Sequence, residues 1–139
     1  MRNRVARRIT SFMNGLLYVA VGGALGASGR YVLGHAMFNI MGPGFPWGTL
    51  AANVLGGLLM GLLVGWLAFK VSGGENLRLL LGVGVLGGFT TFSSFSLEVV
   101  RMIETKTYGL AAGYISASVV LSILALFAGL ILARKVFAL

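Results

Sequence analysis

Four long apolar segments, separated by short turns and flanked by basic residues, dominate this 139-residue chain. We expect them to form helices over residues of about 12–39, 48–69, 77–102 and 109–133. Each is as long as the ~20 residues that a helix needs to cross a hydrocarbon layer of ~30 Å. With 58% hydrophobic and 10% charged residues, the chain is far more apolar than a soluble domain. The sequence predicts an all-α integral membrane protein, with one four-helix domain at 12–139 after a basic extension at 1–11.

The basic residues predict the orientation of the helices. With four spans both chain ends lie on one side, which collects Arg2, Arg4, Arg7, Arg8, Lys70, Arg78, Arg134 and Lys135. The other side has Arg101 and Lys106. The positive-inside rule then favours cytoplasmic ends. The first segment also fits a secretory signal peptide, but its apolar pattern resumes beyond Arg30, which favours a helix that stays in the membrane.

The residue inventory excludes several classes of function. The formal charge of +8 suggests nucleic-acid binding, but the basic residues flank apolar runs instead of forming a basic face. Cysteine is absent, Glu75, Glu98 and Glu104 are the only carboxylates, and His35 is the only histidine. An enzyme that uses paired acids, a metal cluster or a catalytic triad would have almost no residues to work with, so we expect no enzyme.

The third apolar segment contains the most unusual stretch, Gly84 to Ser96, reading G-V-L-G-G-F-T-T-F-S-S-F-S. Adjacent glycines each cost roughly 1 kcal/mol relative to alanine in a helix, and the hydroxyls after them offer the backbone other hydrogen bonds. We therefore expect the third helix to be unwound around Gly87 to Thr90. Broken helices at membrane depth are tolerated where protein or a watery cavity satisfies the backbone, and ions are often held there.

Glycines at 57, 61 and 65 of the second segment form a small-residue stripe, on which another helix can approach closely. Asn53 sits one turn before Gly57 on the same stripe.

Tyr114, Ser118 and Ser122 recur at every fourth position of the fourth segment, so that they form a polar line along an apolar helix. Such hydroxyls commonly bond one helix to another in membranes. With Asn53 and Thr49 they could equally line a narrow path for an ion that loses its water. The sequence leaves both interpretations open.

Phe92 and Phe95 share a face of the helix that resumes after the break. They are either lipid-facing or core aromatics, or rings whose positive edges face an anion. Arg30 lies inside the first span, where it either reaches the interface or concentrates anions at a pore mouth. Glu98 either pairs with Arg101 or contacts the permeating ion, and His35 is expected at the interface.

Three motifs together resemble the Fluc (CrcB-type) family of fluoride channels. They are G-G-A-L-G-A-S-G-R-Y at 22–31, G-T-L-A-A-N-V-L-G at 48–56 and G-G-F-T-T-F-S-S-F-S at 87–96. The likeness extends over all four helices and omits only the basic extension. It implies a channel of the bacterial plasma (inner) membrane that exports fluoride passively down its electrochemical gradient and so protects the cell from fluoride toxicity.

The resemblance also implies an antiparallel, dual-topology dimer with two fluoride pores and a central sodium ion. The backbone carbonyls of Gly87 and Thr90 would hold the sodium, and Phe92 and Phe95 would turn their ring edges to fluoride. The other residues of the implied ion pathway are Arg30, Thr49, Asn53, Tyr114, Ser118 and Ser122. The N-terminal arginines unbalance the charge, so the partner is either a second copy or an oppositely oriented homologue.

Two rival functions fit a small four-helix membrane protein. A proton-coupled exporter resembling the small multidrug-resistance proteins needs a membrane-embedded carboxylate in its first helix, and no acid precedes Glu75 here. A non-transporting assembly protein would use its glycines and phenylalanines for packing alone.

Overall fold

The computed structural model describes residues 2–69 and 74–137, and all regular structure in these ranges is helical. Its elements are α1 (Arg2–Met41), α2 (Trp47–Leu67), α3 (Gly74–Leu77), the π-helix η1 (Arg78–Leu86), α4 (Gly87–Phe89), α5 (Phe92–Glu104) and α6 (Tyr108–Phe137). Within the described ranges, four helical stretches are long and apolar enough to cross a membrane: Arg8–Met41, Trp47–Leu67, Gly74–Glu104 and Tyr108–Phe137. This confirms the four predicted spans. Lys70, expected to follow the second span, lies outside the described residues.

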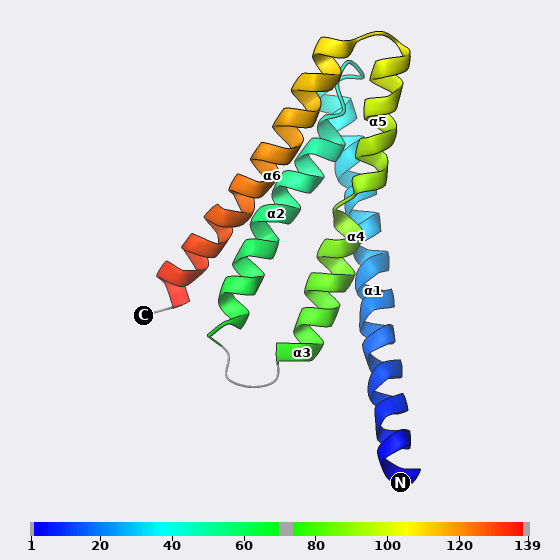
Figure 1. Cartoon of the computed structure of the whole chain (residues 1–139), viewed down its shortest axis with the longest axis vertical. Coiled ribbons are helices and arrows are strands. Elements are labelled where there is room, and N and C mark those ends of the chain that lie inside the picture. Colours follow the sequence, from blue (N-terminus) through cyan, green and yellow to red (C-terminus); the bar gives the residue numbers. More distant parts are fainter. Residues whose placement is uncertain (1, 70–73, 138–139) are drawn as a thin grey trace.

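The spans pack as two pairs. The α1 helix runs along η1 and α4, whereas α2 runs along α6 (Figure 1). The first turn of α1 and the last turn of α6 lie toward the same end of the molecule, as four spans require (Figure 1). The α5 helix packs against α6 at the other end.

Helix α1 begins at Arg2, ahead of the start expected near residue 12, so the basic extension continues the first span as helix. The reason lies in the composition, since no glycine or proline occurs between Arg2 and Asn14 and arginine and alanine are good helix formers. At 1.5 Å per residue the 40-residue helix is about 60 Å long, twice the hydrocarbon thickness.

The glycine stripe of α2 faces α6, as predicted for a surface of close helix approach. A Cβ on Gly57 would lie 2.7 Å from the carbonyl oxygen of Ser122, and one on Gly61 would collide with that of Leu126. From the other side, a Cβ on Gly129 would collide with the carbonyl oxygen of Leu58. The two backbones are therefore in direct contact, and dispersion between them replaces the hydrophobic effect that lipid cannot supply.

Replacement of Gly61 by alanine is expected to lower the thermal stability of the detergent-solubilised protein, because the new methyl group must push α6 away. Overpacking of this kind costs about 1–3 kcal/mol. The matched control is Gly113→Ala on α6, where nothing lies within 4 Å of an added Cβ. Thermal unfolding followed by circular dichroism compares the two, and equal melting temperatures would contradict the close α2–α6 contact.

The third span is broken, as predicted, but not at its glycines. Gly87 and Gly88 stay helical in α4, and the chain extends at Thr90 (φ −78°, ψ 158°) and Thr91 (φ −153°, ψ 127°). Gly88 serves the packing instead, because a Cβ on it would lie 2.6 Å from the carbonyl oxygen of Gly23 in α1, whereas Gly87 is exposed. The nine-residue π-helix before the break was not predicted.

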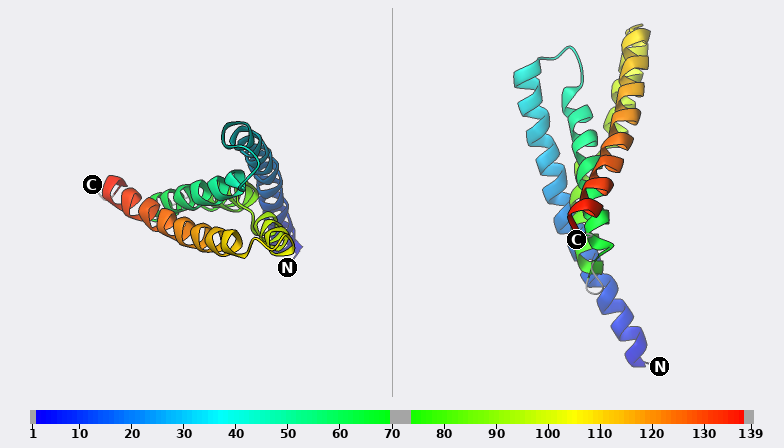
Figure 2. Two further views of the ribbon diagram at one scale, coloured as in Figure 1. Left: turned by 90° about the horizontal axis from the view of Figure 1, so that it is seen from above. Right: turned by 90° about the vertical axis from the view of Figure 1, so that its left-hand side faces the viewer.

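Beyond the break the helices diverge into two arms, each of which combines parts of both pairs. One arm holds the end of α1 and the start of α2, and the other holds α5 and the start of α6 (Figure 2). A pocket of about 910 Å³ opens between the arms and is lined by residues of both, from Arg30 to Thr49 and from Glu98 to Leu110.

Candidate functional site

Asn53 holds the break in the third span from α2. Its side-chain oxygen accepts the backbone N–H of Thr91 at 2.8 Å, and its amide nitrogen donates to the Thr91 carbonyl oxygen at 3.0 Å. A carboxamide has a donor and an acceptor side by side, so it pairs with an extended residue as a neighbouring strand would. One amide hydrogen of Asn53 is left over from this pairing.

Local hydroxyls close both helix ends at the break. The Thr90 hydroxyl donates to the carbonyl oxygen of Leu86 at 3.0 Å, and that oxygen also accepts the Thr90 N–H. Thr91 is the N-cap of α5, because its hydroxyl oxygen accepts the N–H of Ser94 at 3.2 Å. The T-T-F-S-S sequence thus specifies the end of α4 at Phe89 and the start of α5 at Phe92, with two residues between them.

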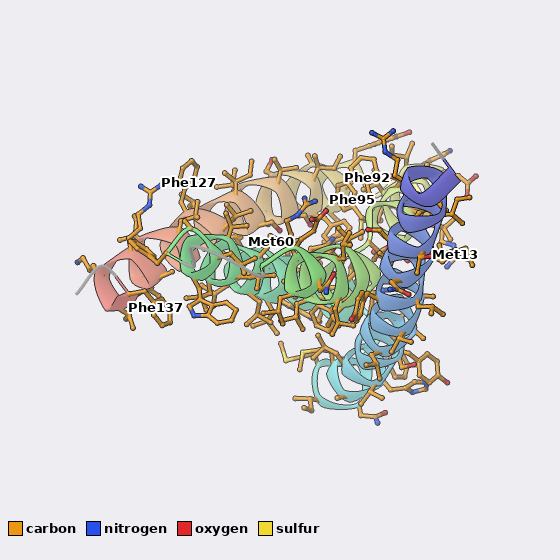
Figure 3. The ribbon with its side chains drawn as sticks, turned by 90° about the horizontal axis from the view of Figure 1, so that it is seen from below. Met13, Met60, Phe92, Phe95, Phe127 and Phe137 are labelled. Atoms are coloured by element: carbon orange, nitrogen blue, oxygen red, sulfur yellow. The ribbon has the colours of Figure 1, made fainter. Side chains whose placement is uncertain are left out.

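Four aromatic rings form a chain of contacts beside the break. The centroids of Phe92 and Phe95 lie 5.5 Å apart, and Phe95 lies 5.2 Å from Tyr114, which contacts Phe45 edge-on at 5.3 Å. Phe95 and Tyr114 are buried, whereas Phe92 is 77% exposed (Figure 3). The predicted phenylalanine pair therefore exists, with one ring inside the chain and the other on its surface.

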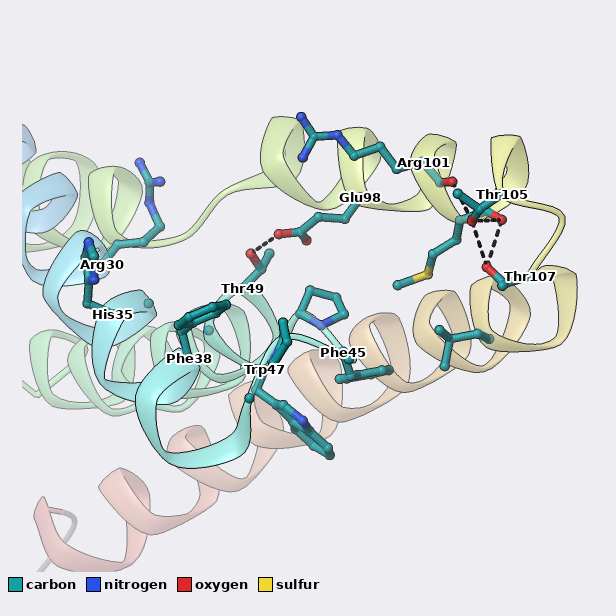
Figure 4. Close-up of a pocket in the computed structure, with 18 of the residues that line it drawn as sticks. Arg30, His35, Phe38, Phe45, Trp47, Thr49, Glu98, Arg101, Thr105 and Thr107 are labelled. Atoms are coloured by element: carbon teal, nitrogen blue, oxygen red, sulfur yellow. Dashed lines mark hydrogen bonds between the residues drawn. The ribbon is translucent and has the colours of Figure 1, made fainter.

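Glu98 joins two residues of the predicted pathway that come from different helices. The Thr49 hydroxyl donates to one carboxylate oxygen at 2.7 Å, and the Tyr114 hydroxyl donates to the other at 2.7 Å. The first of these bonds is visible in Figure 4. Both carboxylate oxygens of Glu98 therefore accept hydrogen bonds from hydroxyls. An ion pair with Arg101, the alternative expected from the sequence, is not what holds this carboxylate. In the sequence, Glu98 stands out because a carboxylate is rare inside an apolar span.

Ser118 and Ser122 continue the line of Tyr114 along α6. The side-chain oxygens of both serines are buried, and within the described residues neither has a hydrogen-bond partner. Leaving a buried hydroxyl unpaired costs about 1–3 kcal/mol, so each such group requires an explanation. Ser116, which lies off the line, is exposed. The structure thus separates the serines of α6 into a buried set and an outward one.

Arg30 is placed at the inner end of the pocket between the two arms. Its Nε donates to the carbonyl oxygen of Gly88 at 3.3 Å, which leaves the two terminal nitrogens of the guanidinium for other contacts. The pocket is lined by Arg30, His35 and Arg101 together with Thr49 and Glu98 (Figure 4). His35 contacts Tyr31 edge-on, with ring centroids 4.7 Å apart. Two arginines and one glutamate lie at the wall of the pocket, and the excess of positive charge favours anions.

The pathway residues expected from the sequence form two connected groups and one outlier. Thr49 and Tyr114 bind Glu98, Phe95 packs against Tyr114, and Ser118 and Ser122 continue from Tyr114 along α6. Asn53 and Arg30 instead contact the backbone of the break. Phe92 points away from the chain, so the fold of a single chain does not enclose it.

Gly87 and Thr90 lie on the two sides of the helix end, and the amides that would normally pair with their carbonyls are used elsewhere. In a continuous helix these amides would be those of Thr91 and Ser94. Here they donate to the side chains of Asn53 and Thr91. Carbonyl oxygens without donors suit a hard cation such as sodium.

The sequence matches the family described as CrcB-like protein, Camphor Resistance (CrcB), over residues 17–130. The chain belongs to this family. Relatives named fluoride-specific ion channel FluC occur in Caulobacter vibrioides (strain NA1000 / CB15N) and Phenylobacterium zucineum (strain HLK1). They are 58% and 60% identical over 127 residues, which cover 91% of this chain and 100% of each relative. A relative of the same name in Agrobacterium fabrum is 51% identical over 125 residues, covering 90% and 100%.

Membership in the CrcB family confirms the resemblance seen in the three sequence motifs. The matched range includes every residue of the site, from Arg30 on α1 to Ser122 on α6. The family assignment and the geometry of the site therefore concern the same part of the chain.

Proposed function

We propose that this CrcB chain forms a fluoride-selective channel through which fluoride leaves a bacterial cell across the inner membrane. The observation that carries the proposal is the name fluoride-specific ion channel FluC, which relatives 51–60% identical over nearly the whole chain share. A negative interior potential drives an anion outward, so the gradient alone suffices. Such export protects the cell from fluoride toxicity, and the activity is conduction, not catalysis.

Fluoride accepts hydrogen bonds and donates none, so its path must offer donors. Ser118 and Ser122 supply free hydroxyls along the wall, and Asn53 supplies the amide hydrogen that Thr91 does not use. Thr49 and Tyr114 line the same path, with their hydroxyl hydrogens donated to Glu98. Phe92 and Phe95 add positive ring edges. Arg30 attracts anions into the pocket. Several weak neutral sites let an ion both enter and leave.

The working unit is proposed to be an antiparallel, dual-topology dimer with two pores. Two observations favour an incomplete site in one chain: Phe92 projects from the surface, and the two arms leave an open pocket between them. A second copy inserted the other way would bring its own Phe92 beside this pocket. An oppositely oriented homologue would satisfy the same geometry.

A sodium ion is proposed at the centre of this dimer, held by the Gly87 and Thr90 carbonyls of both chains. The donor set fits, because these oxygens lack their usual amide partners and Gly87 is exposed on the surface of the single chain. When bound, the ion offsets the cost of burying carbonyl dipoles that have no donor. Its role is structural.

The function is tested with purified protein in liposomes that are loaded with fluoride or with chloride and contain a potassium ionophore for charge balance. An ion-selective electrode should record rapid loss of fluoride and retention of chloride, with no pH gradient imposed. Liposomes without protein are the control. Equal loss of both halides would contradict selectivity, and efflux that needs a pH gradient would favour the exporter.

A further inference from the structure

The carbonyl oxygens at the break fall into two groups, those that have a partner in the chain and those whose usual partner is taken away. Leu86 accepts from Thr90, Gly88 accepts from Arg30, and Thr91 accepts from Asn53. The carbonyls of Gly87 and Thr90 belong to the second group, since the amides of Thr91 and Ser94 donate to side chains. The division follows from the side chains that contact the break.

Asn53 accounts for the diverted amide of Thr91. The two hydrogen bonds, at 2.8 Å and 3.0 Å, hold Thr91 in its extended conformation and keep its N–H away from Gly87. The neighbouring Gly56 lets α2 come close enough, because a Cβ there would collide with the Thr90 methyl group. A side chain with only a donor or only an acceptor could satisfy one of the two backbone groups, not both.

Arg30 contacts the break from α1. Its Nε–H donates to the carbonyl oxygen of Gly88, which lies between Gly87 and Phe89 in α4. A guanidinium at the carboxyl end of a helix also interacts favourably with the helix dipole. The break is thus contacted by α1 through Arg30 and by α2 through Asn53.

We propose that Asn53 and Arg30 are positioning residues that clamp the break and thereby leave the carbonyls of Gly87 and Thr90 for a cation. Asn53 removes the amide that would pair with Gly87, and Arg30 occupies the competing oxygen of Gly88. The inference rests on the proposed sodium site and gives two pathway residues a second task. It couples the proposed anion path to the cation site, because each residue contacts the break and has donors left over from that contact.

The test measures sodium binding and not conduction. Thermal unfolding of the solubilised protein is followed while sodium chloride replaces N-methylglucamine chloride at constant ionic strength. A cation that binds only the folded protein raises the melting temperature with concentration. We expect Asn53→Ser and Arg30→Met to raise the sodium concentration for the half-maximal shift at least tenfold, since each loses a contact that presents the carbonyls.

Two control variants separate the effect of the contact with the break from the effects of charge and of polarity. Arg101→Met removes an equal charge from the same pocket but makes no contact with Gly88, and Asn14→Ser repeats the asparagine exchange at an exposed position of α1. Both should keep the parent midpoint. An arginine that acts through charge alone would repel sodium, so tighter sodium binding in Arg30→Met would overturn the proposal, as would an unchanged midpoint in both clamp variants.

Two further readouts keep the inference distinct from the proposed function. If the parent conducts fluoride but sodium does not stabilise it, the cation site and this inference fail while the channel stands. If the parent shows the sodium shift without fluoride efflux, the channel fails alone. Should Arg30→Met not fold, Arg30→Lys retains the charge but not the planar fork, and a parent-like midpoint there would refute the role of the contact.

Discussion

Replacement of Phe95 by isoleucine is expected to lower fluoride efflux about thirtyfold while the protein stays folded. Phe95 is buried between Phe92 and Tyr114, next to the residues that bind Glu98. The edge of a phenyl ring carries positive charge that an aliphatic side chain lacks. By analogy with a desolvated cation–π contact, one such contact with an anion contributes about 2 kcal/mol, which corresponds to about thirtyfold in rate.

The same exchange at three positions distinguishes the path from the packing. Phe92→Ile should reduce efflux to a similar extent, although Phe92 is exposed in the single chain and contributes little to its core. Phe127→Ile, on an exposed part of α6, should conduct like the parent. Fluoride electrodes measure the flux and circular dichroism the folded fraction. Parent-like efflux from both Phe92→Ile and Phe95→Ile would rule out a role for the ring edges.

Apolar length and glycine spacing were enough to predict the four spans, the break in the third and the close approach on the α2 stripe. These features depend on local properties of the sequence, namely segment length, helix propensity and the size of residues one turn apart. The position of the break was less well predicted. Two glycines weaken a helix, but Gly88 is compensated by contact with Gly23, so the chain extends two residues later.

The connections within the site could not be predicted, because they join residues far apart in the sequence. Thr49 and Glu98 are 49 positions apart, and Asn53 and Thr91 are 38 positions apart. The packing of α2 and α6 against the third span decides that Asn53 faces the backbone and that Glu98 meets hydroxyls instead of Arg101. The sequence identified each of these residues as unusual for a membrane helix, but not its partner.

Replacement of Ser118 by alanine is expected to reduce fluoride efflux about tenfold and to leave the melting temperature unchanged or higher. A hydrogen bond to a charged group contributes about 1.5–3 kcal/mol, so one lost donor corresponds to a tenfold decrease or more. The matched control is Ser116→Ala, which makes the same exchange two residues away on the exposed face of α6. It should leave both the flux and the stability at the parent values.

Ser118→Ala should lower the fluoride efflux without lowering the melting temperature only if the serine belongs to an ion path. A hydroxyl that bonds one helix to another stabilises the fold, so its removal would lower the melting temperature and affect the flux only through misfolding. The buried oxygens of Ser118 and Ser122 have no such partner within the described residues, and exchange to alanine removes the unpaired hydroxyl together with its desolvation cost. Keeping them is therefore unfavourable for the single chain, and the proposed path assigns them to a ligand that needs donors. A destabilised Ser118→Ala protein with normal efflux would assign these serines to helix association instead.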